Sequence, residues 1–133
     1  MANAVATKAL VFKNGTLTCM ARVVGADATA IVQAELSSIA YSVYALDPDD
    51  EDAQTVVTGH DGTALTVASV VYDTLQTDDD RLAVDSTGYN FLHEIDVSTA
   101  EAFPVRGVNY LVHYELTPTS GQVIDVQFCV DCK

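Results

Sequence analysis

Residues 108–116 read Val-Asn-Tyr-Leu-Val-His-Tyr-Glu-Leu, and every second side chain of this stretch is apolar or aromatic. Side chains of a β-strand point alternately to opposite faces of a sheet, so this period of two predicts a strand with one buried face. The alternation is stronger here than anywhere else in the chain. We therefore expect a central strand in which Tyr110 and Val112 are buried.

The same alternation recurs at about residues 16–24, 37–46, 89–97 and 124–130, with turns rich in Gly, Asn and Asp between these stretches. Short strands at such regular spacing are typical of an all-β protein with two packed sheets. The side chains expected to face the core are Leu17, Cys19, Ala21, Val23, Ile39, Tyr41, Val43, Ala45, Tyr89, Phe91, Ile95, Val97, Ile124, Val126, Phe128 and Val130.

The segment from 54 to 75 contains two different patterns. Stretches 54–58 and 63–67 flank Gly59-His60-Asp61-Gly62, which predicts a hairpin with an exposed polar turn. The apolar residues that follow recur at helical spacing and predict one short helix with Thr66 as its N-cap. The core face of that helix would carry Val67, Val70, Val71 and Leu75.

Gly107 and Tyr110 form a Gly-x-x-Tyr pattern directly before the strongest strand. It resembles the tyrosine corner of immunoglobulin-like domains, in which the phenol bonds a backbone group upstream. We therefore predict an antiparallel immunoglobulin-like β-sandwich of about seven strands with one short helix. Residues 13–133 would form this domain. Residues 1–12 would form an N-terminal arm, with a first strand as the alternative; residues 1–11 are mostly apolar and carry only Lys8 as a charge.

The composition limits the kinds of partner that the chain can bind. Its 133 residues contain 6 Lys and Arg but 19 Asp and Glu, for a formal net charge of −13. Such a field repels phosphate, so we expect neither nucleic acid nor an anionic membrane as a partner. No stretch is long enough to span a bilayer, and the N-terminus is a poor signal peptide. Without export, the three cysteines should be reduced thiols.

Several side chains could in principle support catalysis or metal binding. Cys129-x-x-Cys132 lacks the second pair of ligands that structural zinc requires, and residues three apart on a strand point to opposite faces. His60 should be solvated in its turn, His93 should be a hydrogen-bonded core residue, and His113 should make surface contacts. No nucleophile motif accompanies them. We therefore assign no catalytic, cofactor-binding or metal-binding residue, although the acidic runs 47–52 and 78–80 leave weak calcium binding open.

Four segments resemble small immunoglobulin-like virion proteins encoded beside the head and tail genes of tailed bacteriophages. They are Ala21-Arg22-Val23-Val24-Gly25, Tyr41-Ser42-Val43-Tyr44, Asp85-x-x-Gly88-Tyr89-Asn90-Phe91 and Leu116-Thr117-Pro118-x-x-Gly121. The resemblance covers residues 15 to 130 and implies no catalytic residue. It implies a capsid decoration (cement) protein or a neck, tail or fibre module.

We therefore expect a non-enzymatic virion structural protein that is assembled in the host cytoplasm and decorates the capsid. Its partners would be the major capsid protein or tail proteins, and it would act as a homo-oligomer or within a lattice. The apolar arm could pair with the sheet edge of a neighbour. The alternative is a tail, neck, fibre or host-attachment module that recognises a glycan or a protein. The absence of Trp, the usual aromatic platform for sugars, favours assembly.

Overall fold

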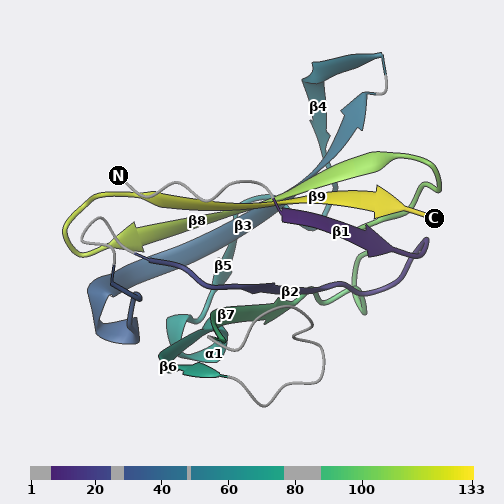
Figure 1. Cartoon of the computed structure of the whole chain (residues 1–133). Coiled ribbons are helices and arrows are strands. Elements are labelled where there is room, and N and C mark those ends of the chain that lie inside the picture. The colour runs from purple at the N-terminus through teal and green to yellow at the C-terminus, as the bar shows by residue number, and fades with distance from the viewer. Residues whose placement is uncertain (1–6, 25–28, 48, 77–87) are drawn as a thin grey trace.

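The computed structural model describes residues 7–24, 29–47, 49–76 and 88–133, except for the side chains of residues 7 and 50–52. The described residues form two β-sheets and one short helix, so the all-β expectation is confirmed. Figure 1 shows the two sheets as stacked layers, with a hairpin of the larger sheet projecting beyond the rest of the molecule.

The larger sheet has the strand order β1-β9-β8-β3-β4, and β5 pairs with a second part of β3. These strands are β1 (Thr7–Val11), β3 (Leu36–Asp47), β4 (Asp50–Val56), β5 (Thr63–Leu65), β8 (Asn109–Pro118) and β9 (Ile124–Cys132). In β8, Val112 lies opposite Val43 of β3 on one side and Phe128 of β9 on the other. The predicted central position of this strand is therefore confirmed.

The smaller sheet has the order β2-β7-β6, with β2 (Thr18–Ala21), β6 (Val71–Gln76) and β7 (Tyr89–Glu94). A 3₁₀ turn, η1 (Gln33–Glu35), precedes β3, and the helix α1 (Val67–Val70) directly precedes β6. Side chains from both sheets join in one hydrophobic core. Tyr110 and Val112 are only 1% and 0% exposed, as the alternation of 108–116 predicts.

The hydrogen bond between the Tyr110 hydroxyl and an upstream backbone group, which the Gly-x-x-Tyr pattern predicts and which we call the tyrosine corner, is present. The backbone N–H of Val105 donates a 3.0 Å hydrogen bond to the hydroxyl of Tyr110. Gly107 makes the turn with φ of +83°, a conformation that is costly for residues with a Cβ atom. Its N–H donates to the carbonyl of Cys132, which attaches this corner to the end of β9.

The expected arm at residues 1–12 is wrong for its second half, which belongs to the domain. Residues Thr7–Val11 form β1, which pairs in parallel with β9, so the larger sheet is mixed rather than fully antiparallel. Val11 is buried in the core, and residue 133 donates its N–H to the Val11 carbonyl. The core-facing side chains of β9 are buried. An apolar strand beside β9 enlarges this buried face of the sheet, which explains why β1 pairs there. Residues 1–6 lie outside the described residues.

The hairpin predicted between stretches 54–58 and 63–67 is also wrong. These stretches fall in β4 and β5, which do not pair with each other but each pair with β3. In the acidic run 47–52, for which the charge repulsion predicts an exposed loop, β3 ends at Asp47 and β4 begins at Asp50, so part of the run is strand. The long strand β3 provides partners for both neighbours, and no local turn signal could reveal that choice.

The expected helix is half helix and half strand. Helix α1 ends at Val70, and Thr66 occupies the N-cap position without a side-chain cap hydrogen bond. Val71–Gln76 forms β6, so Leu75 lies on a strand. Two β-branched valines, which favour extended backbone, stand where the chain changes conformation. With β1 and β6 added, the described residues hold nine strands rather than about seven.

Candidate functional site

His60 is buried, contrary to the expectation that it is solvated in its turn. Its side chain is 2% exposed and lies between two partners. Nε2 lies 2.9 Å from the carbonyl oxygen of Ala100, and Nδ1 lies 2.7 Å from the hydroxyl of Tyr41. A carbonyl only accepts, so Nε2 carries the hydrogen, and in the neutral ring Tyr41 donates to Nδ1.

The side chain of His60 is buried because the segment around Ala100 packs against this turn. Gly59 has φ of +90°, and a Cβ atom at this position would lie 2.6 Å from the Cβ of Ala100. The backbone of His60 also accepts a hydrogen bond from the N–H of Val43 in β3. The side chain of His60 thus enters the interior, although Gly59, Asp61 and Gly62 of the same turn are exposed.

A second polar group lies in the same region, between the two sheets. Nδ1 of His93 on β7 lies 2.7 Å from the hydroxyl of Tyr114 on β8, and this hydroxyl also forms a hydrogen bond with Cys19 on β2. Tyr41 lies beside them, with its ring centroid 5.0 Å from that of His93. The prediction of His93 as a hydrogen-bonded core residue is confirmed.

Burial favours the uncharged forms of Cys19, His93 and Tyr114, the cluster between the two sheets. It raises the pKa of the Cys19 thiol to about 12, although the hydrogen bond to Tyr114 acts in the opposite direction. Burial, and to a lesser extent the nearby His60, lowers the pKa of His93 from 6.5 to about 4. The pKa of Tyr114 is raised well above its usual range, again chiefly by burial. A neutral thiol is a poor nucleophile, and the hydrogen bonds of His93, Tyr114 and Cys19 join strands of the two sheets.

The remaining sequence candidates lie apart from this cluster. His113 lies on the outer face of β8 with Nε2 3.0 Å from the carboxylate of Asp125. Cys129 is half-buried on the outer face of β9, whereas Cys132 is buried on the inner face, so the two thiols point in opposite directions as predicted. His113 therefore has a local structural role in its pair with Asp125.

The acidic runs offer no assembled cation site in the part of the chain that the structure describes. Asp47 uses one carboxylate oxygen to accept the N–H of Asp49, which closes the hairpin turn. Among the described residues, no group of three or more His, Cys, Asp or Glu side chains is placed to hold a metal ion. The run 78–80 lies outside those residues.

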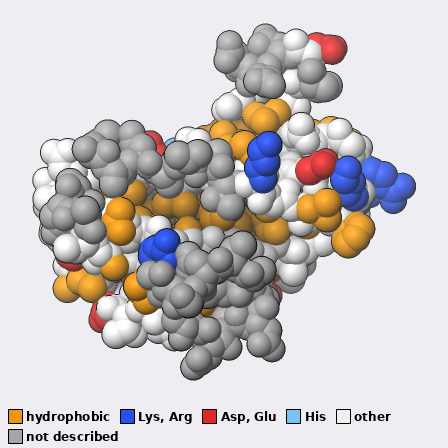
Figure 2. All heavy atoms as spheres, in the orientation of Figure 1, with side chains coloured by type: hydrophobic (Ala, Val, Ile, Leu, Met, Phe, Trp, Pro, Cys, Tyr) orange, Lys and Arg blue, Asp and Glu red, His pale blue; other side chains and the backbone are white. Residues whose placement is uncertain are grey.

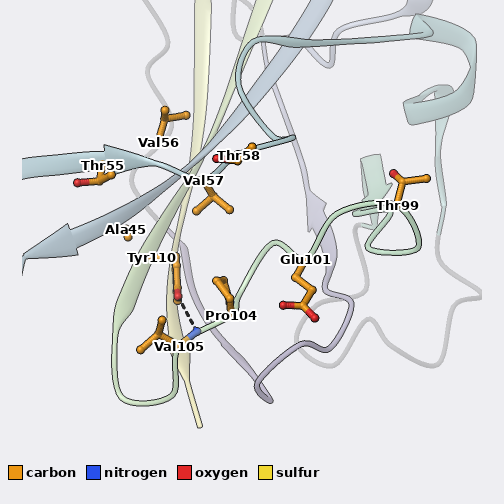
Figure 3. Close-up of a pocket in the computed structure, with 10 residues that line it drawn as sticks. All are labelled: Ala45, Thr55, Val56, Val57, Thr58, Thr99, Glu101, Pro104, Val105 and Tyr110. Atoms are coloured by element: carbon orange, nitrogen blue, oxygen red, sulfur yellow. Dashed lines mark hydrogen bonds between the residues drawn. The ribbon is translucent and has the colours of Figure 1, made fainter.

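A groove of about 600 Å³ opens beside the tyrosine corner. Figure 3 shows its two sides: the ends of β3 and β4 with the residues after β4, and the segment from Thr99 to Val105. Tyr110 lies between these sides with its hydroxyl bonded to the N–H of Val105. The residues that line the groove are mostly apolar or uncharged, with Glu101 as its acidic member.

Large hydrophobic side chains are exposed around the end of the molecule that carries the C-terminus. Phe12 is 70% exposed, Leu10 53% and Val105 52%. Phe12 lines the same hollow as Arg106 and residue 133. Figure 2 shows hydrophobic and basic side chains next to one another at this end. We refer to Leu10, Phe12 and Val105 as the apolar end, and such a concentration of exposed apolar residues is typical of a surface that binds another protein.

A scan against protein-family models finds no match for the chain, and searches of curated proteins and of solved structures find none either. Among the described residues, no helix combines the length and the apolar character needed to cross a membrane.

Two interior residues could not be identified from sequence patterns. His60 lacks any local signal of burial, since Ala100, the residue that covers it, is distant in the sequence. Asn90 on β7 is also buried, and its amide bridges the segment after β2 to the segment before β3. It accepts from the N–H of Val23 and donates to the carbonyls of Val23 and Ile31. The sequence signal for Asn90 was its position as a polar residue between the aromatic residues Tyr89 and Phe91.

Proposed function

We propose that this chain is a non-enzymatic structural protein of a bacteriophage virion, and specifically a capsid decoration (cement) protein that stabilises the head lattice through protein–protein contacts. The observation that carries this proposal is the apolar end, where Leu10, Phe12 and Val105 are more than half exposed. Such side chains contribute free energy when a partner removes them from water, at about 25 cal/mol per Å² of apolar area.

We also propose that the two sheets form an immunoglobulin-like sandwich. The order of strands supports this, because β9-β8-β3-β4 and β2-β7-β6 correspond to the G-F-C-C′ and B-E-D sheets of that fold. The hydroxyl of Tyr110, near the start of the F-like strand β8, bonds the backbone five residues upstream. The usual inter-sheet disulfide is replaced by a packed interior in which Cys19 is a free thiol.

The interior supports a structural rather than a catalytic role. The histidine and tyrosine side chains between the sheets are used in hydrogen bonds that join separate strands. In the described part of the chain, every buried side-chain nitrogen or oxygen has a hydrogen-bond partner. An enzyme usually holds polar groups ready for a substrate, with pKa values near the working pH. Here burial moves the pKa values of Cys19 and His93 away from neutrality, in the direction of their uncharged forms.

The assignment to a phage virion rests on the four sequence segments that resemble small virion proteins. Their residues have structural roles that suit a stable module: Val23 and Tyr41 lie in the core, and Asn90 bridges two segments. The alternative role, a tail, neck, fibre or host-attachment module, is favoured by the groove beside Tyr110, which could hold a segment of a partner.

A reconstitution experiment tests the proposal. Phage heads grown without this chain are mixed with the purified protein and sedimented, and we expect the protein to bind to saturation. Phe12→Asp with Val105→Asp should weaken binding by more than about tenfold, because charges replace apolar contacts. Val123→Asp, which alters an exposed valine away from the apolar end, serves as the matched control. The proposal fails if wild-type protein stays unbound, or if the variant with Phe12→Asp and Val105→Asp binds as the wild type does.

A further inference from the structure

Three segments of the chain meet at the end of the molecule where β1 and β9 finish. Figure 1 shows these two strands running side by side to this end. The N–H of Lys133 donates to the carbonyl of Val11, and the N–H of Lys13 donates to the main-chain oxygen of Lys133. The N–H of Gly107, at the tyrosine corner, donates to the carbonyl of Cys132. Backbone hydrogen bonds therefore hold the three segments together.

A hollow of about 570 Å³ lies where these segments meet, and its lining includes Phe12, Arg106 and Lys133. Lys13 lies close by, because it acts together with Arg106 on the thiol of Cys132. Burial raises the pKa of this thiol, and the two cations act in the opposite direction. Three of the 6 basic residues of the chain thus gather at one end, although the net charge is −13. We refer to Phe12, Lys13, Arg106 and Lys133 as the basic hollow.

The positive charges of the basic hollow are only partly neutralised. Nζ of Lys133 lies 3.1 Å from a carboxylate oxygen of Asp131. Among the described residues, no acidic group forms an ion pair with Lys13 or Arg106, and both side chains are exposed. A carboxylate on a partner can therefore pair with these two cations without displacing another, and a guanidinium can bind it through two parallel hydrogen bonds.

The exposed ring of Phe12 adds an apolar component to the same place. Ion pairs that stay open to water contribute little affinity, because water and salt screen them. Phe12 is 70% exposed and lines the hollow beside Arg106. An apolar side chain that covers this ring buries apolar area and also excludes water from the neighbouring ion pairs, which strengthens them. The hollow therefore matches a segment that carries both carboxylates and apolar side chains.

We propose that the basic hollow binds a short acidic segment of another protein, in which carboxylates pair with Lys13 and Arg106 and an apolar side chain packs on Phe12. The inference rests on the proposed function, since Phe12 also belongs to the apolar end. It adds the chemistry of the partner surface that this end contacts.

The charge of the whole chain selects this partner over other anions. Nucleic acid is a long polyanion, and its phosphates would extend from the hollow over a chain in which 19 acidic residues outnumber 6 basic ones. An anionic membrane meets the same repulsion. A second copy of this chain brings a further net charge of −13 and is repelled as a whole. A short acidic segment places its charges only where the cations lie.

NMR titration of the isotope-labelled full chain with a short capped peptide of alternating Glu and Leu tests the proposal. At an ionic strength of about 0.1 M we expect a Kd of about 1 mM or below, with the largest shifts at the backbone amides of residues 12–13, 106–107 and 132–133. The same peptide with Gln in place of Glu should bind at least about tenfold more weakly. The acidic peptide should weaken to a similar extent at about 1 M salt, because the ion pairs are then screened.

Charge reversal in the hollow is compared with charge reversal elsewhere. Lys13→Glu and Arg106→Glu should each weaken binding of the acidic peptide at least about fivefold, because a carboxylate then faces a like charge. Phe12→Ser should weaken it as well, through the loss of apolar contact. Lys8→Glu, at an exposed position on β1 outside the hollow, changes the net charge by the same amount and should leave the Kd within about twofold.

The proposal is overturned if the acidic peptide does not bind, if its neutral counterpart binds as tightly, or if Lys8→Glu weakens binding as much as Lys13→Glu and Arg106→Glu do. Tighter binding of oligothymidylate, or of vesicles that contain phosphatidylglycerol, would also overturn it, because the hollow would then prefer phosphate anions. None of these measurements uses phage heads. A chain that binds heads but not the peptide refutes this inference alone, and a chain that binds the peptide but not heads refutes the proposed function alone.

Discussion

The hydroxyl of Tyr110 on β8 accepts a 3.0 Å hydrogen bond from the backbone N–H of Val105, five residues earlier in the chain. This bond holds the segment that leads into the central strand and that also forms one side of the groove. Tyr110 itself is buried, with its ring 5.3 Å from that of Phe103.

Tyr110→Phe removes the acceptor and leaves the Val105 N–H without its partner, while the ring can keep its packing. We expect a loss of about 1–2 kcal/mol in the free energy of unfolding, measured by urea denaturation. Tyr44→Phe, at a half-exposed position on β3, is the control and should cost less than about 0.5 kcal/mol. Equal stability of Tyr110→Phe and the wild type would mean that the corner bond contributes nothing.

His60→Ala should destabilise the protein by about 2–4 kcal/mol, because it creates a cavity and leaves the Tyr41 hydroxyl and the Ala100 carbonyl without their shared partner. Thermal and urea unfolding measure this change. His113→Ala offers a matched comparison, since it breaks a partly exposed pair with Asp125 and should cost less than about 1 kcal/mol. If the two substitutions have similar effects, His60 is not the interior bridge described above.

Acidification should destabilise the protein between about pH 6.5 and pH 4, partly through His93. Burial lowers the pKa of this base to about 4 in the folded state, so the unfolded chain, with a pKa near 6.5, binds more protons in this window. The contribution is therefore fully present above pH 6.5 and is lost as the pH falls toward 4. His93→Gln, which does not titrate, should show a shallower fall in unfolding free energy over the same range. An unchanged slope in this variant would contradict the buried neutral form.

The three thiols should differ in reactivity toward an alkylating reagent at mildly alkaline pH. Cys129 is half-exposed and should react first, whereas Cys19 is buried with a pKa raised to about 12 and should react only when the protein opens. Cys132 is buried as well and should also be slow. Mass spectrometry of timed samples assigns each site, and all three thiols should react in denaturant. Rapid labelling of Cys19 in the folded protein would disprove the closed interior.

The strands with strict alternation were predictable from sequence, and the reason is physical. In β8 and β9 one face is fully buried, so Tyr110, Val112, Phe128 and Val130 had to be apolar while their neighbours were free to vary. The tyrosine corner was predictable too, because Gly107 and Tyr110 lie three residues apart and their geometry is local.

What the sequence could not reveal depends on contacts between distant residues. The burial of His60 requires Ala100, the pairing of β4 and β5 with β3 requires a long central strand, and β1 finds its partner at the far end of the chain. A four-residue polar turn, a valine-rich segment and a short apolar N-terminal stretch each have several local solutions. Tertiary packing selects among them, so these elements were misjudged while the core strands were not.

The central claim, that the chain is a structural protein of the virion head, is tested most directly by quantitative mass spectrometry of purified particles. Virions are separated into heads and tails on a density gradient, and the abundance of this chain is compared with that of the major capsid protein in each fraction. The account predicts that the chain is found in the head fraction at many copies per particle. Its absence from both fractions, or its presence in tails alone, would contradict the claim.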